Sequence, residues 1–310
     1  MANLGYIQLT RRCNQHCIIC SNPENENTLS LARAKKEIDD LIKEGYDGII
    51  FSGGEPTLYP ELLPVIAYCK KKKISARIIT NGQRTADLKF TKGLAGAGLD
   101  HVHLSIYSYK PRIQAKLSQN KDSFANIQKS LENFVKLDIT VDINTAINKY
   151  NADHLSRTVR WVVKNYPFIR HFVFNNLDPY MNRASENADT IPCLNDFELE
   201  LHRALEFLSS NKKTFRVERV PLCYLTDFEH VSTETRKIVK NENRAVYFLD
   251  QRGKVSQEDW HYKQGAKCQS CGLKDICAGL YGAGKFYFEE ELSPVFSGKE
   301  EIIKKIRSEA

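Results

Sequence analysis

The sequence predicts an α/β protein: a partial (β/α)6 TIM-like barrel followed by a smaller, cysteine-rich α+β extension. Two observations predict this class. In the first 180 residues, short segments rich in β-branched residues alternate with amphipathic helical segments, and after that point the alternation stops and cysteines gather in one loop. Six βα repeats imply a parallel sheet with its helices outside, and they are too few for a closed eight-stranded barrel.

Strands are expected wherever β-branched and aromatic residues cluster between turn signals. In this chain those segments are residues 6–10, 48–52, 76–80, 101–107, 139–147 and 171–175. Helices are expected between them, as in SFANIQKSLENFVKLD, where Phe124, Ile127, Leu131 and Phe134 recur at helical spacing. We therefore expect residues 1–180 to form the barrel core.

The pattern changes in the C-terminal third of the chain. Residues 181–310 are expected to form the smaller unit, which begins with a loop, a helix (FELELHRALEFLSS) and a strand (TFRVERV). A hairpin is predicted in AVYFLDQRGKV, turning between Asp250 and Gly253. A cysteine-rich loop and a charged helix, KEEIIKKIRSEA, complete this unit.

Composition and charge limit the classes of protein to consider. With 42% hydrophobic and 27% charged residues among 310, the chain can bury a large core. It has no apolar run of about 18 residues and begins without a secretory signal, so we expect a cytoplasmic protein with no membrane partner. The net charge of +7 is mild and includes Lys70–Lys73 at a predicted helix end, so a nucleic-acid partner is not favoured.

Polar residues and glycines follow the predicted strands, at the edge where the active sites of parallel α/β sheets collect. Three cysteines follow the first strand, Gly53-Gly54-Glu55-Pro56 follows the second, and Asn81 follows the third. Ser105 lies on the fourth strand and Asn148 follows the fifth. Polar groups at so many strand ends favour an active site there.

The segment CNQHCIIC places Cys13, Cys17 and Cys20 on one short loop after the first strand. Three thiolates can bind one metal ion or three irons of a cubane cluster. Structural zinc sites use four protein ligands, usually in two C-x2-C pairs, and a disulfide would leave one thiol over in a reducing compartment. The fourth ligand position is therefore predicted to be open to an exogenous ligand.

These motifs resemble the radical S-adenosylmethionine (radical SAM) superfamily, over about residues 5–180. The resemblance implies a radical SAM enzyme in which Cys13, Cys17 and Cys20 hold a 4Fe–4S cluster. The fourth iron of that cluster would bind the amino and carboxylate groups of S-adenosylmethionine. One-electron reduction, by a flavodoxin or ferredoxin-type donor, would then release a 5′-deoxyadenosyl radical that abstracts a substrate hydrogen.

The resemblance also implies cofactor-binding roles at the strand ends. The segment Gly53-Gly54-Glu55 would meet the ammonium group of the methionine moiety, and the alternative is a plain tight turn. By position, Ser105 resembles the strand-four residue that contacts the ribose, and the alternative is a serine of the barrel interior. Asn81 and Asn148 are further candidates, with helix capping as the alternative.

Two positions depart from the family pattern. The DPYMNRA segment resembles the family's Pro-x-Gly-Arg-Ala turn with Asn182 in place of the glycine, which makes Arg183 a candidate partner of a carboxylate. The residue before the third cysteine is usually aromatic in this family and is Ile19 here. We therefore expect no ring stacking on the adenine.

A second cysteine group comprises Cys268, Cys271 and Cys277, with Cys223 upstream. Its spacing, followed by Ala-Gly, resembles the twitch and SPASM extensions of radical SAM enzymes and implies one auxiliary 4Fe–4S cluster. The alternative is a zinc-ribbon site, because four cysteines also suit zinc. Cys193 lies in the loop between the two units and is expected to be inert, a hydrogen donor to a substrate radical, or a replacement cluster ligand.

Three functions are weighed on these motifs. A maturase acting on a peptide or protein side chain is favoured, because twitch and SPASM extensions often accompany that role. The alternative is an epimerase or dehydrogenase acting on a small molecule such as a sugar, an aminoglycoside or a nucleotide; GTP cyclisation is disfavoured because its second cluster uses a longer final cysteine gap. An electron carrier or zinc scaffold would not need Gly-Gly-Glu-Pro or polar strand ends.

Overall fold

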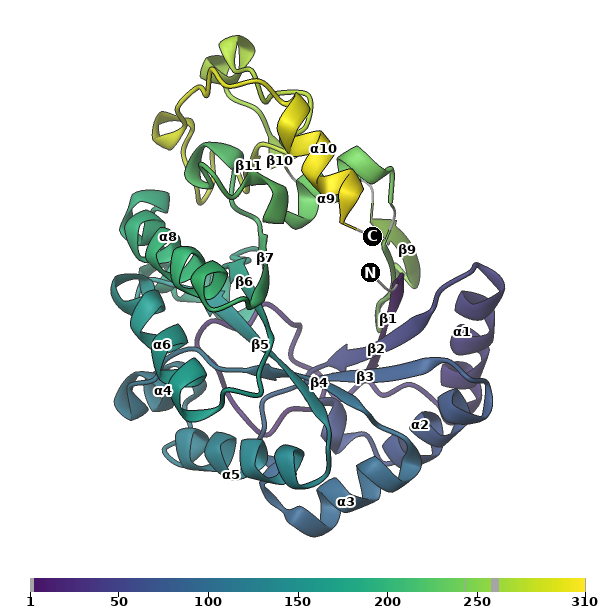
Figure 1. Cartoon of the computed structure of the whole chain (residues 1–310). Coiled ribbons are helices and arrows are strands. Elements are labelled where there is room, and N and C mark those ends of the chain that lie inside the picture. Colours follow the sequence, from purple (N-terminus) through teal and green to yellow (C-terminus); the bar gives the residue numbers. More distant parts are fainter. Residues whose placement is uncertain (1–2, 243, 258–261, 310) are drawn as a thin grey trace.

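A curved β-sheet wrapped by helices forms most of the molecule, as the computed structural model shows (Figure 1). The structure describes residues 3–242, 244–257 and 262–309. The strand order is β7-β6-β5-β4-β3-β2-β1-β8-β9. Neighbouring strands from β7 to β8 are parallel, and β9 pairs with β8 in the antiparallel direction. The predicted α/β class and partial barrel are confirmed.

The strands of this sheet are β1 (Leu4–Thr10), β2 (Gly48–Gly53), β3 (Ser75–Thr80), β4 (His101–Ser105), β5 (Thr140–Ile147), β6 (His171–Asn176), β7 (Thr214–Glu218), β8 (Arg244–Tyr247) and β9 (Lys254–Gln257). A two-stranded sheet joins β10 (Tyr262–Lys263) to β11 (Leu280–Tyr281). The helices are α1 (Leu31–Lys43), α2 (Leu62–Lys71), α3 (Leu88–Ala97), α4 (Pro111–Ser118), α5 (Ser123–Lys136), α6 (Leu155–Asn165), α7 (Asn182–Glu186), α8 (Leu194–Ser210), α9 (Thr233–Lys240) and α10 (Glu300–Ser308).

The sheet extends beyond the six predicted strands at both edges. Strand β7 pairs with β6, and β8 pairs with β1, so residues 214–257 contribute to the same sheet as the first 180 residues. The predicted hairpin is confirmed as β8–β9, with the amide of Gly253 donating to the carbonyl of Asp250. The division of the chain at residue 180 stays a prediction.

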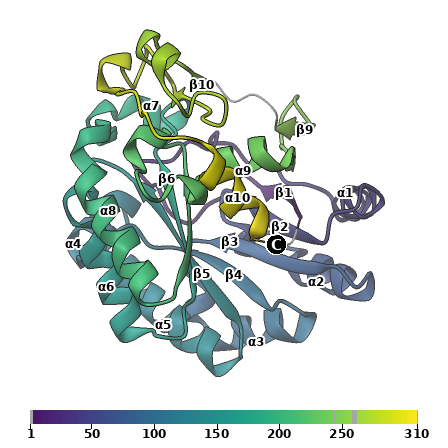
Figure 2. The same ribbon diagram turned by 45° about the horizontal axis from the view of Figure 1, so that its top comes forward.

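The two faces of the sheet differ in chemistry because successive side chains of a strand point to opposite faces. On β4, Val102 and Leu104 are fully buried in the apolar core, whereas His101, His103 and Ser105 alternate with them and are partly exposed. The helices cover the outer face, as Figures 1 and 2 show. The inner face of the barrel is therefore its polar face.

Helices α9 and α10 and the β10–β11 ribbon lie beyond the barrel strands, on one side of the molecule (Figure 1). Helix α10 packs against α9, where Arg236 donates a 2.7 Å hydrogen bond to Glu309. Among the described helices, none combines the length and apolarity that crossing a membrane requires.

Candidate active site

The loop after β1 gathers the three N-terminal cysteines at the carboxyl edge of the sheet. All three thiols are free, and the amide of Cys20 donates to the carbonyl of Cys17 at 3.1 Å. Burial, together with the charge of the neighbouring thiols, raises the pKa of Cys13 to about 11 and that of Cys17 to about 12. A bound cation would offset this cost and hold the thiols as thiolates.

The Gly53-Gly54 segment lies directly against the start of this loop. Gly53 has a φ of +130°, and a Cβ atom added to it would lie 2.2 Å from the carbonyl oxygen of Thr10. A Cβ on Gly54 would lie 2.3 Å from the carbonyl oxygen of Arg11, because the amide of Gly54 donates to Thr10 at 2.7 Å. The close backbone approach expected of these glycines is therefore made to the cysteine loop; their contact with S-adenosylmethionine stays a prediction.

The carboxylate of Glu55 is buried and lies among donors of the protein. One oxygen accepts from the hydroxyls of Thr57 and Thr80, both at 2.7 Å, and the other accepts from the amide of Asn81 at 2.7 Å. Burial raises the pKa of Glu55, and these donors oppose that rise. The side chain thus joins the ends of β2 and β3, and its predicted part in binding the methionine ammonium is untested.

Asn81 is the contact between β3 and the cysteine loop. Its side-chain nitrogen donates to Asn14 at 2.8 Å and lies 3.8 Å from the sulfur of Cys13, while its side-chain oxygen accepts from the amide of Gln83. Asn148 is fully buried, and its side chain bonds within its own turn, to Ala146 and Tyr150. Asn81 is therefore brought to the cysteines, whereas Asn148 shapes a turn after β5.

The segment that begins α7 packs on the same loop. The Nε of Arg183 donates to the carbonyl of Cys17 at 2.9 Å, its guanidinium pairs with Glu24, and the amide of Ala184 donates to the carbonyl of Cys20. Asn182 has a φ of +53°, in the left-handed region that glycine adopts most readily and asparagine tolerates. This conformation explains why asparagine can stand where the family pattern has glycine.

The remaining predicted residues lie at different places on this edge. Ser105 ends β4, partly exposed on the inner face, in register with Asn144. Cys193 is exposed and precedes α8, with its amide donating to Asp196 at 2.9 Å. Ile19 is buried against Leu117 and Ala184. The roles expected of Ser105 and Cys193 stay predictions.

Sequence reasoning missed two residues that contact the cysteines. The side chain of Tyr107 lies beside Cys17, and burial beside the thiols raises the pKa of its hydroxyl well above the usual value. The buried Gln15 accepts from the thiol of Cys17 at 3.6 Å and donates to Ser123 at 3.1 Å. The alternation of Tyr107 with Ser105 along the chain could have indicated that Tyr107 faces the site. No pattern in the sequence indicated that Gln15 would be buried beside Cys17.

The second cysteine group forms a pocket of its own, far along the chain from the first. Cys223, Cys268, Cys271 and Cys277 all line one pocket. Backbone amides face two of the sulfurs: Gly279 donates to Cys277 and Val295 to Cys271, each at 3.4 Å. Thiolates surrounded by backbone donors are a donor set suited to a metal centre.

The spacing of the thiols bears on the kind of centre. Among the described residues, only one group of three or more metal-ligand side chains has its ligand atoms all within 4.8 Å of one another. That group contains no cysteine. A single zinc ion at about 2.3 Å from each sulfur would hold the sulfurs about 3.8 Å apart. Both cysteine groups are therefore wider than a mononuclear zinc site, and the donors fit a cluster of several irons.

An open (β/α) barrel whose carboxyl edge carries three thiols on one glycine-cradled loop defines a class of protein: an iron–sulfur enzyme of the barrel type. The family model described as the radical SAM superfamily matches residues 7–162. The chain belongs to the radical SAM superfamily, and it is a radical SAM enzyme. Membership implies a 4Fe–4S cluster and S-adenosylmethionine as its cofactors.

Several curated enzymes are similar to about half of this chain. Fe-coproporphyrin III synthase of Methanosarcina barkeri is 36% identical over 46% of this chain and 37% of its own length. A probable GTP 3′,8-cyclase of Thermococcus kodakarensis is 29% identical over 46% and 47%. S-adenosylmethionine-dependent nucleotide dehydratase of Selenomonas ruminantium is 28% identical over 59% and 73%. The chain thus spans less than half of the first two relatives.

Solved structures extend the likeness of fold to nearly the whole chain. Streptococcus suis SuiB bound to S-adenosylmethionine has a TM-score of 0.67 at 17% identity, over 90% of this chain and 73% of that one. SuiB bound to the precursor peptide SuiA has a TM-score of 0.68 at 16% identity, over 90% and 72%. At these identities the likeness is one of fold, and it includes part of the C-terminal unit.

Proposed function

We propose that this radical SAM enzyme modifies a peptide or protein side chain. The observation that carries the proposal is the match of fold over 90% of the chain to SuiB bound to its precursor peptide SuiA, at a TM-score of 0.68. PqqA peptide cyclase of Methylocella silvestris, 28% identical over half of this chain and 43% of its own length, also supports a peptide substrate. The four-cysteine pocket agrees with the extension that the sequence predicts for such enzymes.

In this proposal Cys13, Cys17 and Cys20 hold the first cluster. When bound, that cluster supplies the single electron that cleaves S-adenosylmethionine to the 5′-deoxyadenosyl radical. The protein's part is to hold the loop rigidly: Gly54 locks it against β2, and Arg183 fixes the carbonyl of Cys17. Electrons would come from a flavodoxin or ferredoxin-type donor.

The second pocket is proposed to hold one auxiliary 4Fe–4S cluster on Cys223, Cys268, Cys271 and Cys277. The convergence of Cys223 with the other three supports a four-ligand site, since Cys223 stands 45 residues before Cys268 in the sequence. The wide spacing of the sulfurs supports a cluster over a zinc ion. Its role would be to bind substrate or accept an electron.

Anaerobic reconstitution tests the two clusters separately. We expect about eight irons per chain, and dithionite-dependent release of 5′-deoxyadenosine that Cys17→Ala abolishes. Cys271→Ser should lose about four irons and keep that release, because the two sites use different thiols. Cys69→Ala is the matched control, since Cys69 is a fully buried core thiol outside both groups. Wild-type protein with four irons and one sulfur-bound zinc would refute the auxiliary cluster.

A small-molecule substrate is the second candidate. The nucleotide dehydratase relative supports it, because that match covers 73% of the relative's own length. Synthetic peptides from short open reading frames beside the gene, and a panel of nucleoside triphosphates, separate the two candidates. Deuterium transfer from a labelled peptide into 5′-deoxyadenosine supports the first; transfer from a nucleotide, with none from peptides, supports the second.

A further inference from the structure

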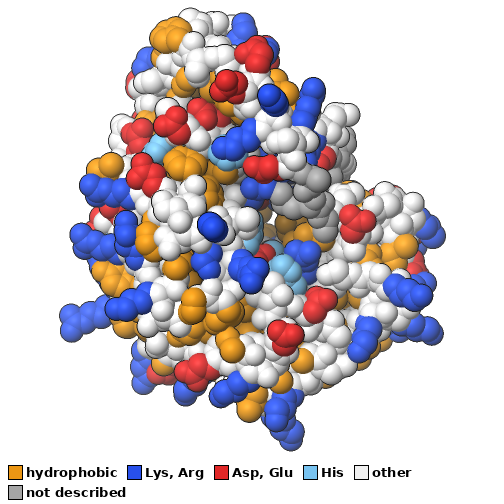
Figure 3. Space-filling model, viewed as in Figure 1, with side chains coloured by type: hydrophobic (Ala, Val, Ile, Leu, Met, Phe, Trp, Pro, Cys, Tyr) orange, Lys and Arg blue, Asp and Glu red, His pale blue; other side chains and the backbone are white. Residues whose placement is uncertain are grey.

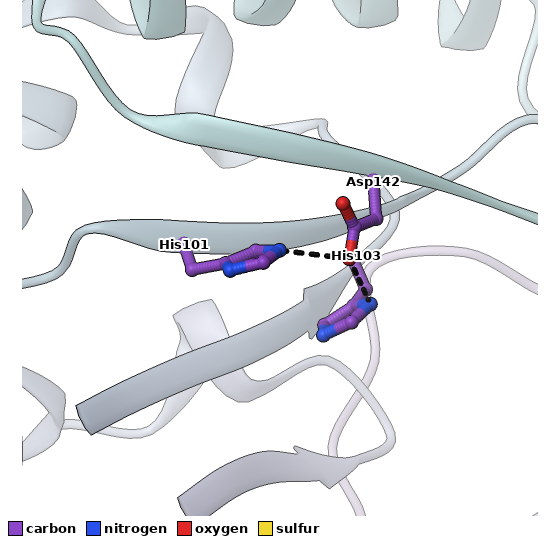
Figure 4. A group of neighbouring side chains, drawn as sticks. All are labelled: His101, His103 and Asp142. Carbon is purple, nitrogen blue, oxygen red and sulfur yellow. Dashed lines mark hydrogen bonds and ion pairs between the residues drawn. The ribbon is translucent and has the colours of Figure 1, made fainter. Parts of the chain in front are cut away.

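A cluster of three metal-ligand side chains lies inside the barrel, away from both cysteine groups. His101 and His103 are two residues apart on β4, so both point to the inner face. Strand register places Asp142 of β5 directly opposite His103. Figure 4 shows both imidazoles directed at the carboxylate of Asp142. Neither the cofactor roles nor the substrate role proposed above uses these residues.

The ligand atoms of this cluster are already close together. The Oδ2 of Asp142 lies 2.8 Å from Nε2 of His101 and 3.4 Å from Nδ1 of His103, and all three atoms lie within 4.8 Å of one another. Atoms bound at about 2.0–2.1 Å to one ion in tetrahedral geometry lie about 3.3 Å apart. The observed spacing needs only a small adjustment to reach that arrangement.

The surroundings of the cluster leave polar demand unmet. The Asp142 side chain is 8% exposed and the His103 side chain is 13% exposed, and Nε2 of His103 is buried without a hydrogen-bond partner. The carboxylate of Asp142 is already hydrogen-bonded to Nε2 of His101, so the unmet demand is that of the His103 nitrogen. An orphaned buried nitrogen indicates a missing partner such as a water, and a water bound to a metal ion at this cluster would supply it.

The cluster lies apart from the cysteine loop along the barrel. Figure 3 shows histidine side chains, in pale blue, within the hollow at the centre of the face viewed in Figure 1. His101 begins β4 and His103 lies at its middle, before Ser105 at the carboxyl end of the strand. The cysteine loop, in contrast, follows the carboxyl end of β1. Because β1 to β4 are parallel, the cluster and the cysteine loop lie toward opposite ends of the barrel.

We propose that His101, His103 and Asp142 form a binding site for one divalent transition-metal ion, with zinc as its expected occupant. Two imidazoles and one carboxylate are a donor set that zinc and other first-row divalent ions favour over magnesium and calcium, which prefer oxygen ligands. Two histidines at alternate positions of one strand, with the third ligand opposite them, form a rigid site because the sheet sets their spacing.

The test must separate this site from zinc bound by cysteines. The reconstituted enzyme, with its iron clusters in place, is equilibrated with zinc sulfate, freed of loose metal by gel filtration, and analysed by elemental analysis and zinc X-ray absorption. We expect one zinc per chain with nitrogen and oxygen neighbours at about 2.0–2.1 Å, whereas zinc on cysteines would show sulfur at about 2.3 Å. The iron count of the same sample shows that the cysteines remain occupied.

Variants make the assignment specific. Asp142→Asn keeps the shape of the side chain but removes its charge, and should weaken zinc binding at least tenfold with the iron content unchanged. His101→Gln is the second variant, because His101 is the most exposed of the three, and it should act likewise. His202→Gln, on α8, is the matched control and should retain zinc. Zinc with sulfur neighbours only, no retained zinc, or zinc binding by both ligand variants as tight as that of the wild type would overturn the proposal.

Discussion

Arg183 is bonded through its Nε to the backbone carbonyl of Cys17, at 2.9 Å, across 166 residues of sequence. The bond ties the start of α7 to the middle of the cysteine loop. The side chain of Arg183 is 18% exposed, and its guanidinium also pairs with Glu24 of the same loop. Arg183, predicted as a partner of the S-adenosylmethionine carboxylate, therefore has a structural role whether or not it also meets the cofactor.

We expect Arg183→Gln to loosen the cysteine loop, because glutamine cannot span both contacts. Residues that orient metal ligands typically contribute about 10–100-fold to metal affinity or activity. The variant should therefore hold less iron and release 5′-deoxyadenosine about tenfold more slowly. Arg203→Gln is the control, since Arg203 makes an exposed ion pair on α8. Equal iron content and rate in both variants would contradict the role.

Gly54→Ala should disrupt the contact between β2 and the cysteine loop. The added Cβ would lie 2.3 Å from the carbonyl oxygen of Arg11 and 2.4 Å from that of Arg12, and both obstacles are backbone atoms. We expect a loss of about 2 kcal/mol or more in unfolding free energy, measured by urea denaturation, and a lower iron content.

The control for that substitution is Gly96→Ala on the exposed side of α3, where a Cβ meets nothing within 4 Å. Alanine has the higher helix propensity, so this variant should gain about 0.5–1 kcal/mol. If Gly54→Ala matched the wild type in stability and iron content, the described packing of the two loops would be wrong.

Tyr107→Phe should change the electronic properties of the first cluster. The hydroxyl of Tyr107 lies beside Cys17, where it can donate to the sulfur, and donors to cluster sulfurs stabilise the more negative, reduced state. Removing one such bond costs about 1 kcal/mol, which is roughly 40 mV for one electron. A redox titration followed by electron paramagnetic resonance should find a more negative potential; an unchanged or more positive one would contradict the contact.

His230 should contribute to acid lability. Burial, helped by the charges of Lys305, Arg216 and Arg236 and opposed by Glu309, lowers its pKa to about 4. Because the unfolded chain then binds the proton between about pH 6.5 and pH 4 while the folded chain does not, stability falls as pH drops through that window.

The measurement is the unfolding free energy of wild type and His230→Gln at several pH values from 7 down to 5. We expect the variant to lose less stability than the wild type over this interval, by about 1–2 kcal/mol, since one unit of pKa difference corresponds to about 1.4 kcal/mol. Parallel curves for the two proteins would show that His230 does not titrate as described.

Local patterns predicted most of the barrel, because strand and helix signals reside in short windows of sequence. The first six strands and helix α5 formed where β-branched or amphipathic segments indicated them. The cysteine spacing in residues 13–20 likewise indicated a metal loop without any tertiary information. The edges of the sheet could not be predicted in this way, since the pairing of β8 with β1 joins segments about 240 residues apart.

The sequence by itself determined the superfamily, since the cysteine loop and the Gly-Gly-Glu-Pro segment are contiguous stretches of chain whose residue types carry their own chemistry. Tertiary structure decided which distant residues meet: Arg183 with Cys17, Cys223 with the three later cysteines, and Asp142 with His101 and His103. The physical reason is that such meetings depend on strand register and on how loops pack. A shift of one residue between β4 and β5 would turn Asp142 to the opposite face and abolish that cluster.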